Sequence, residues 1–471
     1  MKKKFLKYYY KFPILFQNIA ISIFGYTWNK RRYGGVFKQE YINAKEREYF
    51  SFNQWDDYQL GLLRKLLIHS LNTVPYYKNL FQKLGYTEEM LQHFELAQIK
   101  SLPFLEKDTL RQLGETDLVS EKREPKGAFF SSSGSTGTPV KILYSHRMHQ
   151  AYFSIFEARI YNWTNITHKD SRGMIGGRRI IQDGLGSPPY YRYNIFEKQV
   201  YFSAYHISPS TVHDYINGMQ KHKPSFMTGY ASSNYFLARF IEEQGLVAPK
   251  MKAVLSSSEK LTQEMRDTFK RVYGCKTHDS YNGVECCNLI SECEHGKLHI
   301  VPDVGIVEIV DENGNECKPG EIGEIISTGL LNFDQPLIRY RMGDLVKLSL
   351  NQTCECNRSM YIVDEIVGRV EDTIIGIDGR EMVRFHGIFI DIHEIKQAQV
   401  IQNSIYDFQL NIAVTKPLTV EDIESIKNRM YSQLTKDITI EIKFVDHIEL
   451  TSNGKFKAVI SNVKRASIQK I

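Results

Sequence analysis

The sequence predicts an α/β and α+β protein, with a large N-terminal domain of mixed sheets and helices and a small α+β C-terminal domain. Three observations predict this. The chain has 471 residues, which is longer than a typical single domain. Helical and β-like segments alternate through most of it. Near Gly368 the sequence turns rich in glycine and charge, and a compact strand–helix–strand pattern follows. We therefore expect one domain over residues 1–367 and a second over 368–471.

The N-terminal stretch MKKKFLKYYYKFPILFQNIAISIFGYTW begins basic and then turns apolar. Residues 12–28 are interrupted by Pro13, Gln17, Asn18 and Ser22, so they fall short of the apolar run that a spanning helix needs. No small-residue cleavage site follows, which argues against a signal peptide. We expect a packed amphipathic segment. A membrane-surface helix, with peripheral membrane contact, is the alternative, because lysines, tyrosines and a tryptophan flank the run.

The remaining elements follow in chain order. Leu60, Leu63, Leu67 and Leu71 recur at helical spacing, and Pro75 marks the end of that helix. Two more helices are predicted within 210–226 and 231–245. Short β-like runs lie at 252–258, 298–310 and 321–328. The C-terminal pattern is a strand at 409–414, a helix at 420–434 and a strand at 438–445, and we place a hinge before it at 368–372.

The composition, 42% hydrophobic and 24% charged, is that of a folded globular protein. A net charge of +6 is mild: it suits an anionic substrate or loose contact with anionic lipid, and it does not indicate a nucleic-acid-binding protein. The seven cysteines are few, odd in number and confined to 275–356. They do not form the pattern of a secreted disulfide framework, so we expect a reducing cytoplasm.

The stretch FFSSSGSTGTPVKI, residues 129–142, contains eight consecutive residues that are only serine, threonine or glycine. Its aromatic and β-like flanks predict a tight loop joining two strands. Backbone N–H groups and hydroxyls converging in such a loop suit phosphate oxygens. The stretch does not fit the familiar phosphate-loop motif, because Lys141 comes late and no Ser or Thr follows it. Taken alone, it leaves phosphate binding and a flexible linker both open.

Four further stretches stand out in order: DSYNGVE (279–285), LIRYRMGD (337–344), GRVED (368–372) and TSNGKFK (451–457). Each alone has an ordinary explanation, such as solvated arginines or a surface lysine. Together they resemble the adenylate-forming (ANL) ligases, in particular the phenylacetate–coenzyme A ligase branch with its capsular-polysaccharide-associated members. The segments NTVPYYKNLF, LPFLEKDTL and GKFKAVIS extend the resemblance over nearly the whole chain.

The resemblance implies roles for individual residues. The loop would hold the ATP phosphates through hydroxyls and close backbone approach, using Ser132, Ser133, Gly134, Ser135, Thr136 and Gly137. Asp344 would accept hydrogen bonds from the ribose hydroxyls, and Arg369 would face the ribose or phosphate. Tyr281 would flank the adenine, and the nucleotide-binding set would also include Ser258, Glu259 and Asp279.

The catalytic roles follow in the same way. Glu285 would hold Mg²⁺, a cation that prefers oxygen ligands. Lys455 would bridge the substrate carboxylate and the α-phosphate, whose approach needs a cation between them. Glu371 and Asp372 would belong to the hinge. The chain departs from the family at Asn282 and Val284, where glycine and threonine are usual, and this puts the phosphate contacts of the stretch in doubt.

Cys293, His299, Cys354 and Cys356 offer three thiolates and one imidazole, a donor set typical of a closed structural zinc site. Some members of the branch have a similar pattern. The alternative is a cysteine-bearing turn with an unrelated histidine. Cys275, Cys286 and Cys287 are instead expected to be small buried residues.

The leading functional hypothesis is ATP-dependent conversion of a carboxylic acid to acyl-AMP, followed by transfer to a thiol, with coenzyme A implied by the resemblance. Tyr230 and Tyr281 are the expected lining of the acid pocket. A second hypothesis passes the acyl group to a carrier protein or a sugar amine in surface polysaccharide biosynthesis. A third is a non-catalytic nucleotide-binding homologue, against which Glu285, Asp344 and Lys455 argue. A homodimer is a further expectation, and a nucleic-acid partner is not expected.

Overall fold

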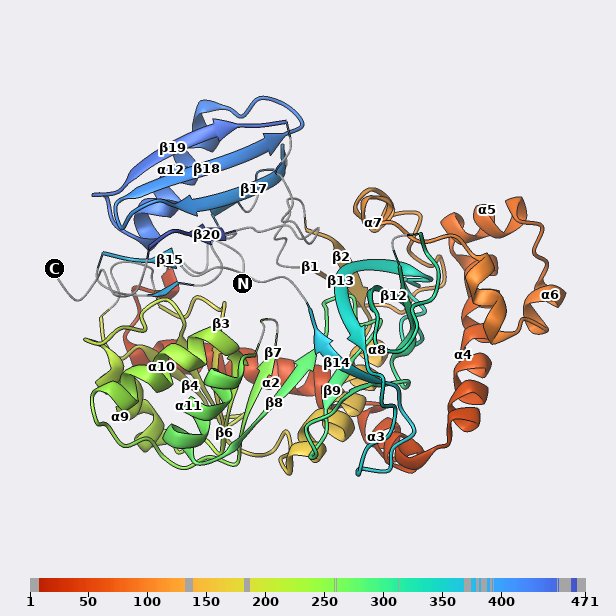
Figure 1. The fold of residues 1–471 in the computed structure, drawn as a ribbon, viewed down its shortest axis with the longest axis horizontal. Helices are drawn as coiled ribbons and strands as arrows, with labels where there is room; N and C mark the ends of the chain where they lie inside the picture. The colour runs from red at the N-terminus through yellow and green to blue at the C-terminus, as the bar shows by residue number, and fades with distance from the viewer. Residues whose placement is uncertain are drawn as a thin grey trace.

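The computed structural model describes residues 8–131, 139–181, 187–257, 261–311, 313–367 and 394–446. It also describes shorter stretches at 259, 374–377, 381–382, 388–389, 392, 448 and 459–463. A 12-stranded sheet forms the large N-terminal region, in the order β11-β12-β13-β14-β10-β9-β8-β7-β6-β3-β5-β4. A separate four-stranded sheet belongs to the C-terminal residues and lies at the top of Figure 1. The predicted α/β and α+β class is confirmed.

One half of the large sheet is built mainly of parallel strands. Its strands are β3 (Arg172–Gly176), β4 (Tyr191–Asn194), β5 (Gln199–Ser203), β6 (Phe226–Tyr230), β7 (Ala253–Ser257) and β8 (Lys276–Tyr281), and only the edge strand β4 runs antiparallel to its neighbour. The crossover helices are α9 (Val212–His222), α10 (Ala231–Glu243) and α11 (Gln263–Tyr273). The predicted helices and the β-like run at 252–258 are therefore confirmed. In such sheets, ligands bind beyond the carboxyl ends of the strands.

The other half of the sheet is antiparallel. It consists of β9 (Ile290–Glu292), β10 (Leu298–Ile300), β11 (Gly305–Val310), β12 (Ile322–Gly329), β13 (Tyr340–Leu348) and β14 (Ile362–Ile366). The β-like run at 298–310 becomes two strands separated by Pro302, which has no N–H for a ladder hydrogen bond. Arg339, just before β13, pairs with Glu308, and Arg341, within β13, pairs with Glu324.

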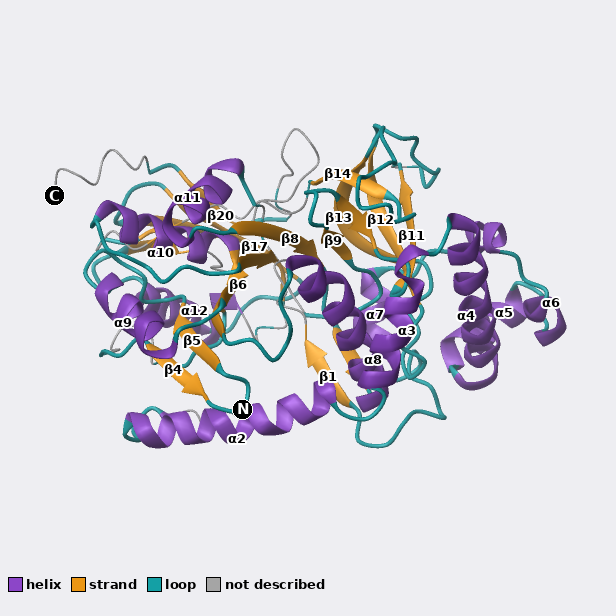
Figure 2. Cartoon of the chain, turned by 90° about the horizontal axis from the view of Figure 1, so that it is seen from below, coloured by secondary structure: helices purple, strands orange, loops and turns teal. Residues whose placement is uncertain are grey.

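Helices from the first 113 residues pack around this sheet. They are α2 (Ile14–Tyr33), α3 (Phe37–Glu46), α4 (Phe52–Thr73), α5 (Pro75–Lys83), α6 (Glu88–Gln92) and α7 (Lys107–Leu113), with the short turns η1 (Arg47–Tyr49) and η2 (Leu96–Ser101). The leucine-spaced helix is confirmed as α4. A capping box of Ser51 and Gln54 starts it, and Pro75 occupies the first turn of the next helix. Figure 2 shows α2 running along the outer edge of the molecule. Among the described residues, no helix has the length and hydropathy needed to cross a membrane.

Strands β1 (Ala128–Ser131) and β2 (Lys141–Tyr144) pair antiparallel, with Ser131 opposite Lys141. They flank the Ser/Thr/Gly stretch, so the two expected strands on either side of it are confirmed. Residues 132–138 themselves lie outside the described residues. The chain then enters α8 (His146–Phe156), whose end is continued by the π-helical turn η3 (Glu157–Tyr161) and by η4 (Asn162–Thr164).

The C-terminal sheet has the order β19-β18-β17-β20, formed by β17 (Ile395–Gln402), β18 (Asp407–Val414), β19 (Thr439–Phe444) and β20 (Val459–Ser461). Helix α12 (Val420–Gln433) covers it and buries Ile426 and Met430 in a core separate from that of the large sheet. A small pair, β15 (Ile374–Ile375) with β16 (Glu381–Met382), precedes it. The predicted strand–helix–strand pattern is confirmed. The expected hinge at 368–372 lies outside the described residues, and the domain boundary there stays a prediction.

Candidate functional site

The ends of three parallel strands bring predicted site residues to one edge of the sheet. Tyr230 ends β6 opposite Ser257, the last residue of β7, and Ser257 in turn lies opposite Ser280 of β8. Tyr281 and Asp279 therefore lie at the same edge as Tyr230, with β7 between them. Glu259 follows β7 by two residues. The expected acid-pocket pair, Tyr230 and Tyr281, thus occupies the part of the fold where α/β sheets bind ligands.

Tyr281 also links the two halves of the sheet. Its hydroxyl donates to Asp344 Oδ2 at 2.8 Å, although β8 and β13 are separated by three strands in the sheet order. Burial, and then the neighbouring Asp344 charge, raises the pKa of Tyr281 well above its usual value, so the phenol remains a neutral donor. A carboxylate accepts several hydrogen bonds at once, so this bond orients Asp344 without using all its acceptor positions.

Glu285 lies on the turn that follows β8. The residue is buried, and a Cβ on Gly283 would lie 2.4 Å from Glu285 Oε2, so the carboxylate packs directly against this glycine. Tyr144 of β2 anchors this turn, because its hydroxyl contacts Val284 O and, at 2.9 Å, Cys286 Sγ. The strand that leaves the Ser/Thr/Gly stretch is therefore bonded directly to the turn that carries Glu285.

The Asp279 carboxyl is buried beside a second carboxyl, that of Glu292. Burial and the neighbouring Glu292 carboxylate raise the pKa of Asp279 from 3.8 to about 7, while Arg266 opposes the shift. The Asp279 backbone N–H donates to Glu292 Oε2 at 2.7 Å, and Arg266 binds both Glu292 oxygens at 3.0 and 2.8 Å. The Asp279 carboxyl therefore holds its proton to a much higher pH than an exposed aspartate does.

Several predicted residues lie outside the described residues, and their roles stay predictions: Ser132, Ser133, Gly134, Ser135, Thr136, Gly137, Ser258, Arg369, Glu371, Asp372 and Lys455. Among the described residues, the structure brings together Tyr230, Asp279, Tyr281, Glu285 and Asp344. Tyr144 was missed by sequence reasoning. It is the last residue of a short β-like run, and no local pattern indicates that its hydroxyl reaches a turn 140 residues further on.

A second constellation unites the four candidate metal ligands. Cys293 follows β9, His299 lies in β10, and Cys354 and Cys356 lie in the loop between β13 and β14. Their ligand atoms all lie within 4.8 Å of one another; Cys293 Sγ is 3.7 Å from Cys354 Sγ, and Cys356 Sγ is 3.4 Å from His299 Nε2. Tetrahedral zinc with Zn–S of about 2.3 Å and Zn–N of about 2.0 Å gives edges of about 3.8 Å and about 3.5 Å. The donor set and its spacing fit zinc.

Groups around the cluster orient these ligands. His299 Nδ1 lies 3.3 Å from the Met360 carbonyl, which leaves Nε2 toward the thiols. A hydrogen bond from the Cys293 thiol, and then one from His299, lowers the pKa of Cys356, whereas the shared proton raises the pKa of Cys293. The edge of the Trp163 ring faces His299 with ring centroids 5.9 Å apart. These contacts therefore favour the thiolate form of Cys356.

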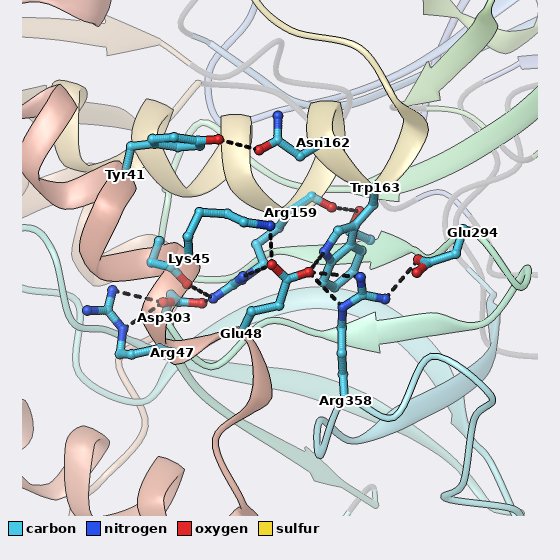
Figure 3. A network of polar contacts seen from close by, with 12 residues as sticks. Tyr41, Lys45, Arg47, Glu48, Arg159, Asn162, Trp163, Glu294, Asp303 and Arg358 are labelled. Carbon is cyan, nitrogen blue, oxygen red and sulfur yellow. Dashed lines mark hydrogen bonds and ion pairs between the residues drawn. The ribbon is translucent and has the colours of Figure 1, made fainter.

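A buried ion-pair network lies next to this cluster (Figure 3). Glu48 is its centre: its carboxylate is contacted by Lys45, by Trp163 Nε1 at 3.0 Å, by Arg358 at 2.8 Å and by Arg159 at 3.8 Å. Burial would raise the pKa of Glu48, but hydrogen bonds from Lys45 and Arg358 outweigh it and hold the pKa below its usual value.

The network extends on both sides of Glu48. Arg358 also binds Glu294 at 2.8 Å, one residue beyond Cys293, and Asp303 accepts from both Arg159 and Arg47. At its margin, Tyr41 donates to Asn162 at 2.6 Å. Arg358 lies two residues beyond Cys356, so the network fixes the cysteine-bearing loop against the N-terminal helices.

Comparison with known proteins gives consistent results. The CapK C-terminal domain model matches residues 378–462. Protein CapK of Staphylococcus aureus is 24% identical over 468 residues, covering 96% of this chain and 98% of its own. The phenylacetate–coenzyme A ligase of Pseudomonas putida is 26% identical over 334 residues, covering 68% of this chain and 71% of its own.

Among solved structures, 2-hydroxyisobutyryl-CoA ligase, in complex with 2-HIB-AMP and CoA in the thioesterification state, superposes with a TM-score of 0.58. It is 17% identical, and the match covers 90% of this chain and 93% of that protein. At this identity the likeness establishes the fold alone.

Proposed function

Because this chain belongs to the adenylate-forming (ANL) superfamily, we propose that it activates a carboxylic acid with ATP and Mg²⁺ and then transfers the acyl group to a thiol. In the first step, a carboxylate oxygen of the acid attacks the α-phosphorus of ATP. The bond between the α-phosphorus and the oxygen that bridges to the β-phosphate breaks, and pyrophosphate leaves. In the second step, the thiol sulfur attacks the acyl carbon, its proton is released, and AMP departs with the electron pair of the broken C–O bond.

The observation that carries this proposal is the Tyr281–Asp344 hydrogen bond at the carboxyl ends of the strands. It places a neutral aromatic ring and an oriented carboxylate together, which suits an adenine flanked by the ring and a ribose bound by the acid. We assign Asp344 to the ribose hydroxyls and Tyr281 to the base, with Glu259 nearby. Glu285 is our candidate Mg²⁺ ligand, because its carboxylate lies on the turn that Tyr144 bonds to β2.

The remaining roles rest on the order of motifs in the sequence. We assign the phosphates to residues 132–137, Lys455 to the carboxylate and α-phosphate, and Arg369 to the ribose or phosphate. Glu371 and Asp372 would form the hinge about which the C-terminal sheet reorients between the two steps. Tyr230 and Tyr281 would line the acid pocket. All seven cysteines are free, which fits the reducing cytoplasm in which we place this reaction.

Coenzyme A is the acceptor we favour, because the phenylacetate–coenzyme A ligases match about two-thirds of the chain. A second candidate keeps acyl-AMP formation and passes the acyl group to a carrier-protein thiol or a sugar amine in surface polysaccharide biosynthesis. The similarity to Protein CapK favours this candidate, because it spans 96% of the chain and the matching C-terminal domain would govern the second step.

Pyrophosphate release tests the proposal. Purified protein with ATP and Mg²⁺ is screened against a panel of aromatic and short polar carboxylic acids, and at least one acid should release pyrophosphate. Consumption of coenzyme A together with AMP formation would identify the preferred acceptor. Pyrophosphate release without coenzyme A consumption would favour the carrier-protein or sugar-amine acceptor. A protein that binds ATP and releases no pyrophosphate with any acid would be the non-catalytic homologue, and the proposal would be wrong.

We also propose that Cys293, His299, Cys354 and Cys356 hold a structural zinc ion. Four protein ligands leave no coordination position for a substrate, so the metal would not take part in the reaction. It would tie β9 and β10 to the loop between β13 and β14.

A further inference from the structure

Helix α2 turns its polar residues toward the protein. Gln17 Oε1 accepts from Arg192 Nε at 2.6 Å, Asn18 Oδ1 accepts from the Tyr193 N–H at 2.9 Å, and Ser22 Oγ accepts from the Ile195 N–H at 3.2 Å. Tyr193 belongs to β4, the edge strand of the large sheet, and Ile195 follows that strand directly. The side chains of α2 thus satisfy donors of a sheet edge that would otherwise be open to pairing.

Helix α2 packs closely against β4, the edge strand. A Cβ on Gly25 would lie 2.0 Å from the Asn194 side chain, so a larger residue at this position would displace that side chain from α2. Arg32, in the last turn, forms an ion pair with the buried Glu197 at 3.5 Å. The orientation of α2 about its own axis is therefore fixed, with its polar face inward.

The opposite face is apolar and exposed. Phe12, Phe16, Ile19, Ile23 and Tyr26 recur every three or four positions, and with Leu15 they form one stripe along the helix and the turn before it. Leu15 is 67% and Ile23 60% exposed. Ile195 and Phe196, which follow β4, are also exposed, and the Phe196 ring lies 5.2 Å from the Tyr26 ring. We call these eight residues the outer patch; Figure 2 shows α2, which carries most of it, along the molecular edge.

The exposed charged residues that the structure describes within the first 39 residues are all lysines. The first 39 residues contain nine of the chain's 60 lysines and arginines and none of its 54 acidic residues. The rest of the chain therefore holds slightly more acidic than basic residues. Arg31 and Arg32 turn inward, toward Tyr144 O and Glu197, whereas Lys11 and Lys30, near the two ends of the helix, are exposed. An apolar stripe with exposed lysines near both ends is complementary to a surface that is apolar inside and anionic at its boundary.

We propose that the outer patch docks the protein onto the surface of an anionic lipid bilayer. The helix would lie in the interface, with the stripe among the acyl chains near the headgroups and the lysines against the anionic headgroups. It would rest on the membrane and not cross it, in keeping with its length and hydropathy. The polar inward face explains why the stripe remains exposed, because turning it toward the protein would remove the side chains that cap β4. This inference does not depend on the proposed function.

Vesicle co-sedimentation of the full-length protein tests the inference. Mixed phosphatidylglycerol–phosphatidylcholine vesicles should pellet the protein, phosphatidylcholine vesicles should pellet much less, and added salt should weaken the binding by screening. Replacing Leu15, Phe16, Ile19 and Ile23 by Gln should reduce partitioning to the mixed vesicles more than tenfold. The matched control replaces Val247, Ile322, Leu350 and Val420 by Gln, four exposed apolar residues elsewhere, and should bind like the wild type.

A second variant separates charge from apolar contact. Replacing Lys2, Lys3, Lys4, Lys7 and Lys11 by Gln should weaken binding to the mixed vesicles roughly fivefold for each lysine that reaches the surface. It should leave the weak binding to phosphatidylcholine unchanged. Equal pelleting of the wild type and the Leu15, Phe16, Ile19 and Ile23 variant would overturn the inference. So would a wild-type dimer that this variant converts to monomer without any vesicle binding, because the occupant would then be a second copy of the chain.

Discussion

Asp344 is the residue on which the nucleotide assignment can be tested most simply. On the proposed assignment, replacing it by Ala would remove a charged acceptor from the ribose hydroxyls, so ATP binding should weaken by about 1.5–3 kcal/mol while acid binding changes little. Tyr281→Phe removes only the hydroxyl that orients Asp344 and should cost less, about 1 kcal/mol. Calorimetric titration with ATP measures both. Asp364→Ala, an exposed carboxyl on β14, is the control, and an Asp344→Ala variant with that control's affinity would contradict the assignment.

The stability of the folded protein should depend on pH through Asp279, and the surroundings of this carboxyl determine the direction of the effect. Its pKa is raised from 3.8 to about 7 in the folded protein, so the folded state holds this proton more tightly than the unfolded chain does. The stabilisation from this proton is complete below about pH 4 and is lost as the pH rises through about 7. Asp279→Asn lacks this contribution, so its melting temperature should fall less than that of the wild type between pH 5 and pH 8.

Melting curves at several pH values check this expectation. Asp267→Asn, an exposed carboxyl on the neighbouring helix α11, serves as control and should keep the wild-type dependence. If Asp279→Asn also followed the wild-type curve over the whole range, the Asp279 carboxyl would be solvated, and its burial beside Glu292 would be wrong.

At the scale of elements, the loop between β13 and β14 is held from two sides. On one side lie the Cys293, His299, Cys354 and Cys356 ligands, and on the other lies the Glu48–Arg358 ion pair. Cys354→Ser should lower the zinc content from about one ion per chain and lower the melting temperature, because metal binding contributes folding free energy.

Metal analysis and thermal melting of the same preparations decide this. Cys317→Ser changes a buried cysteine outside the cluster and should leave the zinc content unchanged. Wild-type protein that is free of zinc and melts normally would end the zinc proposal and leave the ion-pair network as the main tie of this loop.

Elements differ in how far the sequence could predict them. Helix α4 was predictable, because its leucines recur at helical spacing and Pro75 cannot continue the helix. The faces of α2 were not, because periodicity shows that a helix is amphipathic and does not show which face meets the protein. Likewise, the four metal ligands come from three short segments, and only the pairing of β9, β10 and β14 brings these together. The Tyr281–Asp344 bond depends on the path of the whole sheet.

At the scale of the whole molecule, the chain combines a large sheet, which carries the residues we propose for nucleotide binding, with a small C-terminal sheet built on its own core. The alternation of helical and β-like segments predicted the first, and the compact strand–helix–strand pattern after Gly368 predicted the second. How the two parts would be placed relative to each other in each step of the proposed reaction cannot be predicted from local sequence patterns. Lys455, far from the Tyr281 and Asp344 segment in sequence, is therefore the residue through which the whole-molecule account is best tested.

The most direct measurement compares the two half-reactions of Lys455→Ala. The lysine would offset repulsion between the carboxylate and the α-phosphate in the first step only. We expect the variant to bind ATP and fold normally, to release no pyrophosphate from ATP and acid, and still to form thioester from supplied acyl-AMP and coenzyme A. Pyrophosphate release at the wild-type rate would contradict the assignment of the lysine. Loss of both half-reactions in a well-folded variant would contradict the two-orientation account.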